Sequence, residues 1–191
     1  MAWLISTRLS EQYNNYYMKT NLLIGLMLLM GSMTASSQQL AFPGAQGWGR
    51  FATGARNGGS VYHVTNLNDS GTGSLRDAVS QPNRIVVFDV AGVIRINSRI
   101  VFKNNLYVAG QTAPGEGITV FGDGVSFSGA DNIIVRYMRF RMGAVGTKDK
   151  DCAGVANGQN MIFDHCSFAW DRTRTSPSTG TTKERLPRIS P

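Results

Sequence analysis

The stretch Asn132-Ile133-Ile134-Val135-Arg136-Tyr137 decides the fold, because its pattern of an asparagine followed by an apolar strand returns along the chain. The other copies are Asn83–Phe88, Asn105–Val108 and Asn160–His165. The four asparagines are separated by 22, 27 and 28 residues. A period in the twenties is typical of a solenoid, and each period here has the length of one coil of a parallel β-helix.

Each period also holds further short strands, separated by turns rich in glycine. The predicted strands are Gly92–Ile96, Ile100–Phe102, Ile118–Phe121, Val125–Phe127 and Cys166–Ala169. One segment, 74–79, favours a short helix instead, with Ser74 as its N-cap. A solenoid needs such a cap, because its first coil otherwise exposes apolar side chains.

The repeated asparagines have a structural explanation that needs no chemistry. An asparagine tolerates the left-handed backbone region and can hydrogen-bond to its equivalent one coil away. We therefore expect these side chains to form the corners of the coils.

Composition indicates one all-β domain and a modest charge. The chain has 22 glycines and only 16% charged residues, which favours strands and turns. Of the formal net charge of +7, residues 38–170 carry +3, from twelve basic and nine acidic residues. So small a charge argues against a nucleic-acid partner and is compatible with an anionic polysaccharide.

Residues 18–37 have the features of a secretory signal peptide. Lys19 precedes the apolar run Leu22–Met30, and a stretch of small and polar residues around Ala35 offers a cleavage zone. We expect translation to start at Met18, with residues 1–17 a misassigned start, and the protein to be secreted, extracellular or periplasmic. No membrane span should remain after signal removal, because the apolar run is short. The competing interpretation is an ordinary buried helix.

The two cysteines, Cys152 and Cys166, allow two outcomes. They could pair across neighbouring coils in an oxidising compartment, or remain two buried free thiols. Their spacing does not fit a zinc site.

From Ala41 to about Trp170 the chain resembles the bacterial calcium-dependent pectate lyases, which are right-handed parallel β-helices. The matching segments are Ala41–Gly49, Val61–Gly71, Gly73–Val79, Ile85–Ile94, Ala109–Gly115, Asp151–Asn157 and Met161–Phe168. The resemblance implies a monomeric lyase that cleaves polygalacturonate or pectin by calcium-assisted β-elimination. The segment 38–172 would supply its N-terminal coils.

The resemblance also implies roles for four acidic or histidine residues. Asp151 falls on the family's calcium ligand, and Asp149 is a weaker second candidate in the same loop, for which a solvated surface loop is the alternative. The pair Asp164 and His165 is structural in that family and lies beside the groove, although a carboxylate that orients a histidine can also serve as a general base. His63 is expected in the core or at a coil edge.

No catalytic residue is assigned from the sequence. The resemblance implies an arginine base on a later coil, and Arg136, Arg139 and Arg141 do not match its position. They could bind an acidic sugar or lie solvated on a surface strand. Two other functions stay open: a β-helix glycoside hydrolase that uses Asp149, Asp151 or Asp164 as paired carboxylates, and a non-catalytic glycan-binding β-helix.

After Trp170 the strand pattern stops, and prolines and basic residues follow. A shifted reading of the codons for residues 173–180 permits Asp-Glu-Asn-Phe-Ser-Ile-Asn-Trp, which restores both the alternation and two carboxylates. We therefore expect residues 173–191 to be a frameshifted tail and the chain to be a truncated, inactive lyase. An intact reading frame on resequencing of the gene would contradict this hypothesis.

Overall fold

The computed structural model describes residues 16–22 and 38–172. Residues 16–22 form a short helix that belongs to a unit of its own. Most of the predicted signal peptide and the predicted frameshifted tail lie outside the described residues. Within the described parts, no helix is both long enough and apolar enough to cross a membrane.

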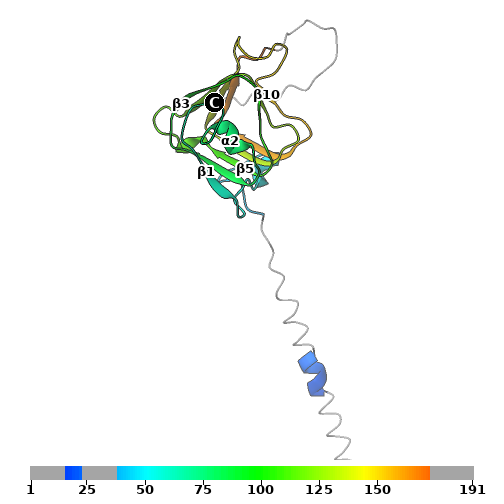
Figure 1. The fold of residues 1–191 in the computed structure, drawn as a ribbon. Coiled ribbons are helices and arrows are strands. Elements are labelled where there is room, and N and C mark those ends of the chain that lie inside the picture. The colour runs from blue at the N-terminus through cyan, green and yellow to red at the C-terminus, as the bar shows by residue number, and fades with distance from the viewer. Residues whose placement is uncertain (1–15, 23–37, 173–191) are drawn as a thin grey trace, which may run out of the picture. The chain divides into compact units, whose positions relative to one another are not determined.

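The second unit winds through three parallel sheets, which Figure 1 shows wrapped around a common interior. Sheet A contains β1 (Ser60–Val64), β2 (Arg84–Phe88), β5 (Leu106–Ala109), β8 (Asp131–Arg136) and β11 (Gln159–Asp164). Sheet B contains β3 (Gly92–Ile96), β6 (Ile118–Gly122), β9 (Met138–Arg141) and β12 (Ser167–Ala169). Sheet C contains β4 (Ile100–Val101), β7 (Val125–Ser126) and β10 (Ala153–Gly154). The chain visits the sheets in the order A, B, C, so the predicted parallel β-helix is confirmed.

The repeated asparagines stand at the corner that leads into sheet A, as the sequence predicts. Their φ angles are 60° at Asn83, 53° at Asn105, 57° at Asn132 and 52° at Asn160. The Asn105 amide donates to the Asn83 side-chain oxygen over 3.0 Å, which links two successive coils. The asparagines are therefore structural.

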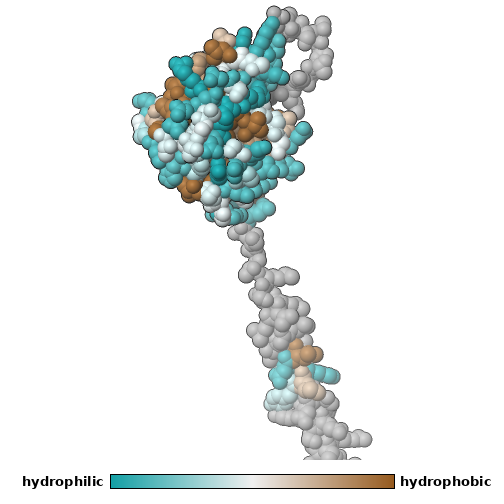
Figure 2. Space-filling model, viewed as in Figure 1, coloured by the Kyte–Doolittle hydropathy of each residue, from teal (hydrophilic) through white to brown (hydrophobic). Residues whose placement is uncertain are grey.

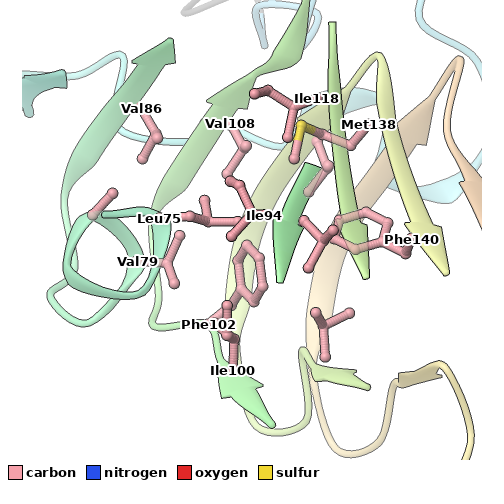
Figure 3. Close-up of a cluster of buried hydrophobic side chains, with 14 of the residues drawn as sticks. Leu75, Val79, Val86, Ile94, Ile100, Phe102, Val108, Ile118, Met138 and Phe140 are labelled. Atoms are coloured by element: carbon pink, nitrogen blue, oxygen red, sulfur yellow. The ribbon is translucent and has the colours of Figure 1, made fainter. Parts of the chain in front are cut away.

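The interior is built from the inward side chains of equivalent strands, which stack coil upon coil. In sheet A, Val86 pairs in register with Val108, Val108 with Val135, and Val135 with Phe163. In sheet B, Ile94, Val120 and Phe140 form the equivalent column and are almost fully buried. Figure 3 shows side chains from both columns, Val86, Val108, Ile94 and Phe140, in one cluster.

The helix predicted at 74–79 is present as α2 (Leu75–Val79). The Ser74 hydroxyl accepts the Asp77 backbone N–H over 3.2 Å, which is an N-cap hydrogen bond. Leu75 and Val79 are fully buried, and Figure 3 shows both directed into the core. The helix covers the first coil (Figure 1), and the face of the molecule in Figure 2 is mostly hydrophilic, with separate apolar patches.

The outer face of sheet A is covered by the segment 39–58, which contains the short helix η1 (Trp48–Phe51). Three small side chains of this segment pack against the buried Ile134, namely Ala41, Ala45 and Ala52. A second short helix, η2 (Gly110–Thr112), follows β5. The contact with the three alanines explains why the outward-facing residue of β8, Ile134, is apolar.

Both cysteines are free, which settles the alternative left open by their spacing. Cys152 is buried in the main core. Burial raises the pKa of the Cys166 thiol to about 11, so this thiol is protonated at neutral pH and is a poor nucleophile.

Candidate functional site

The two predicted calcium ligands lie in one exposed loop, between β9 and β10. Asp149 has a φ of 59°, and its backbone N–H donates to the Arg172 carbonyl over 3.3 Å. The carbonyl of Asp151 accepts from the Arg99 guanidinium over 2.9 Å. Hydrogen bonds of the backbone therefore hold the loop in place, and both Asp149 and Asp151 are exposed residues.

A buried carboxylate, Asp123, fixes the start of this loop. It accepts hydrogen bonds from the Thr147 hydroxyl at 2.8 Å and from the Gly124 N–H at 2.7 Å. Burial by itself would raise the pKa of Asp123, but these hydrogen bonds outweigh burial and hold the pKa below its usual value. Only the charged form accepts all of them, so the loop is anchored by an ionised aspartate.

We expect Asp123→Asn to lower the free energy of unfolding at pH 7 by about 1–3 kcal/mol, because asparagine has a single acceptor oxygen and an NH2 group in place of the second. The native pKa lies below the unfolded one, so the contribution of Asp123 is full above the unfolded pKa and is lost as the pH falls through the native pKa. Urea unfolding should show a difference in the free energy of unfolding between wild type and variant that is smaller at pH 3 than at pH 7. A difference of equal size at both pH values would contradict this role.

The described residues do not by themselves form a complete calcium site. Calcium takes six to eight oxygen ligands. In residues 16–22 and 38–172 there is no group of three acidic, histidine or cysteine side chains placed to hold a metal ion. Asp171, an acidic residue further along the chain, instead accepts the Cys152 N–H over 2.8 Å. The Asp149–Asp151 loop could therefore supply only part of a donor set.

The pair Asp164 and His165 lies at the end of β11, on another side of the solenoid from sheet C. One Asp164 oxygen accepts from Arg136 over 2.7 Å, and the other lies 2.8 Å from His165 Nδ1. The His165 ring stacks on Tyr137 of the preceding coil, with centroids 4.5 Å apart. Both oxygens of Asp164 thus join neighbouring coils or side chains, which supports the structural interpretation.

His63 was expected in the core or at a coil edge. It is not a core residue, so the first of these alternatives is wrong. Its side chain is 58% exposed and Nδ1 lies 3.0 Å from Asp89. The residue sits near the end of β1, on the outward side, where strand alternation directs it to solvent.

The three clustered arginines separate onto two faces. Arg136 ends β8 in sheet A, where it pairs with Asp164 and lies over the Phe42 ring. The next residue, Tyr137, has a φ of 56°, and this turn leads into β9. Arg139 and Arg141 therefore lie on the outer face of sheet B.

On that outer face is a pocket of about 380 Å³, which we call the sheet B pocket. It is lined by Val93, Arg95, Thr119, Phe121, Arg141 and Trp170. The sequence alone did not predict that Arg95, Phe121 and Trp170 line a common pocket with Arg141. Strand alternation places Arg95 and Phe121 outward, but only the register Arg95 to Phe121 to Arg141 brings them together.

Comparison with known proteins gives one consistent result. The chain is 59% identical over 145 residues to a probable pectate lyase C of Aspergillus flavus, covering 76% of this chain and 34% of that protein. It is 58% identical over 156 residues to the Aspergillus fumigatus protein of that name, with 80% and 37% covered. It is 56% identical over 158 residues to the one from Aspergillus terreus, with 83% and 38% covered. The chain thus spans about a third of the length of these relatives.

Among solved structures, the chain resembles the crystal structure of Jun a 1, the major allergen from cedar pollen. The TM-score is 0.50 and the sequence identity 18%, over 63% of this chain and 41% of that chain. This likeness supports the fold alone. No family model matches the chain.

Proposed function

We propose that this chain belongs to a polysaccharide lyase of the pectate lyase type, acting on polygalacturonate or another acidic pectin. The observation that carries the proposal is the 59% identity to a probable pectate lyase C over 145 residues. The resemblance in the sequence and the parallel β-helix both support it. Calcium dependence and secretion of the protein are parts of the same proposal, resting on the Asp151 motif and on residues 18–37.

In the reaction, a base would take the proton at C5 of a uronate unit, and the electron pair of the C5–H bond would form a C4–C5 double bond. The glycosidic oxygen would leave C4 and take up a proton. The C5 proton is acidic because the carboxyl group on C5 can take up the developing negative charge. A bound calcium ion would supply further stabilisation of that charge. The side chains of Asp149 and Asp151 would contribute carboxylate oxygens to it, and the remaining ligands would come from groups beyond the described residues.

The position of Asp164 argues against its use in the hydrolase alternative. A glycosidase needs two carboxylates flanking the scissile bond. Asp164 is bound by Arg136 in sheet A, whereas Asp149 and Asp151 lie in the loop that leads to sheet C. Asp164 therefore lies on another side of the solenoid from Asp149 and Asp151 and does not pair with either of them.

The chain itself should yield little or no unsaturated product from polygalacturonate with calcium, because its described residues provide no group of three metal ligands. The proposal is tested by a chimera that places residues 38–172 into the matching segment of the Aspergillus flavus relative. We expect calcium-dependent growth in the absorbance of the unsaturated product, abolished by a chelator.

The unmodified Aspergillus flavus protein is the control, and circular dichroism confirms that the chimera is folded. A folded chimera without product, beside an active control, would contradict the proposal. Reducing ends that form without the unsaturated absorbance would favour the hydrolase. Asp151→Asn in the chimera should raise the calcium concentration needed for half activity at least tenfold.

A further inference from the structure

The sheet B pocket combines outward side chains from four successive coils. Arg95 on β3 stands in register with Phe121 on β6, and Phe121 with Arg141 on β9. Adjacent strands are about 4.8 Å apart, so the two arginines flank the phenylalanine from strands roughly 10 Å apart. Trp170 follows β12 and closes the pocket on the fourth coil.

The two aromatic rings are held at an angle, and Trp170 leaves apolar surface open. The Phe121 and Trp170 centroids lie 6.4 Å apart with an interplanar angle of 83°. Trp170 is 59% exposed although it is a large apolar residue. Its φ of 69° is part of the turn that places its ring beside Phe121. Aromatic faces exposed in this way pack against the C–H groups of a pyranose ring.

The charges of the pocket are positive and lack carboxylate partners. Arg95 lies over the Phe121 ring at 5.3 Å, and Arg141 over the Trp170 ring at 5.7 Å. Arg141 donates to the carbonyls of Phe140 and Ser167 through one nitrogen. The ion pairs within residues 16–22 and 38–172 involve His63, Arg76, Arg136 and His165, and neither pocket arginine. The lining of the pocket contains no acidic residue.

We propose that the sheet B pocket binds an unesterified uronate unit of an acidic polysaccharide, without a metal ion. The identity of the sugar rests on the proposed function, whereas the need for one apolar ring face and one carboxylate rests on the pocket itself. The guanidinium groups of Arg95 and Arg141 bind the carboxylate of the uronate, and the side chains of Phe121 and Trp170 contact its sugar ring. A methyl ester removes the charge, so the pocket discriminates by esterification.

The test is calorimetric titration of the purified chain with trigalacturonate in buffer that contains EDTA. We expect binding that weakens as salt is raised, because the contacts are charged and partly exposed. Arg95→Gln and Arg141→Gln should each raise the Kd at least fivefold. The methyl-esterified trimer should bind at least tenfold more weakly than the free acid. Trigalacturonate should also quench tryptophan fluorescence in wild type, and Trp170→Leu should remove that quenching.

The matched control is Arg50→Gln, because Arg50 lies over the Phe51 ring at 4.5 Å outside the pocket. Its Kd should equal that of wild type, and Trp48→Leu should keep the quenching. Equal Kd values for Arg50→Gln, Arg95→Gln and Arg141→Gln would overturn the proposal, as would binding that requires calcium. A chimera without lyase activity beside intact binding would instead contradict only the proposed reaction.

Discussion

Phe127→Ala should lower the free energy of unfolding by about 3–5 kcal/mol. Phe127 is fully buried. Its ring centroid lies 4.3 Å from that of Phe102, 4.9 Å from Phe163 and 6.4 Å from Phe140. These rings come from several coils, so the vacated space cannot collapse without moving strands of more than one sheet. Urea unfolding followed by circular dichroism measures the change in midpoint at constant slope.

Phe168→Ala is the matched control for this prediction. Phe168 also stacks on a core ring, with its centroid 5.0 Å from that of Phe140. Phe168 is nevertheless 39% exposed, because β12 is the edge strand of sheet B in the described part of the chain. We expect a cost of about 1–2 kcal/mol. If the two variants cost the same, the interior does not hold the coils together as described.

Gly49→Ala should detach the segment 39–58 from the outer face of sheet A. A Cβ atom at Gly49 would lie 2.0 Å from the carbonyl oxygen of Met161 and 2.5 Å from its carbonyl carbon. Neither atom can move without disturbing β11. Overpacking of this kind costs about 1–3 kcal/mol, and we expect the upper end because the clash is with backbone.

Hydrogen exchange gives the direct measurement for this variant. The Ala41 N–H donates to the Arg50 carbonyl and the Ala52 N–H to the Gly49 carbonyl, over 2.7 Å and 2.9 Å. Both amides should lose protection in Gly49→Ala, while amides of β5 and β8 keep theirs. Trp48→Ala is the control, because Trp48 is 97% exposed and its loss should change stability by less than about 0.5 kcal/mol. Unchanged protection at Ala41 and Ala52 would contradict the proposed packing.

Local signals were enough to predict the coils. The asparagine at each corner indicates a left-handed backbone conformation, and the apolar run after it indicates a buried strand. Both features depend only on residues that are close in sequence. For the same reason Ser74 predicted the start of α2. The packing of the segment 39–58 on sheet A was not predictable from the sequence. Ala41, Ala45 and Ala52 are small residues that give no clear signal of burial, and their partner Ile134 is distant in sequence.

The candidate sites divide in a similar way. The sequence placed Asp149 and Asp151 in one loop, but not the anchoring of that loop by Asp123, 24 residues before Thr147. The run of arginines looked like one cluster, yet the turn at Tyr137 sends Arg136 to sheet A and the others to sheet B.

The sequence by itself determined that this protein is a β-helix similar to pectate lyases, because period, corner residues and motifs are properties of neighbouring residues. Only the tertiary structure decided that Arg95, Phe121, Arg141 and Trp170 line one pocket. Their contact depends on the register between strands of successive coils, while the turns absorb the differences in coil length. A shift of that register by one residue within a strand would turn these side chains to the opposite face.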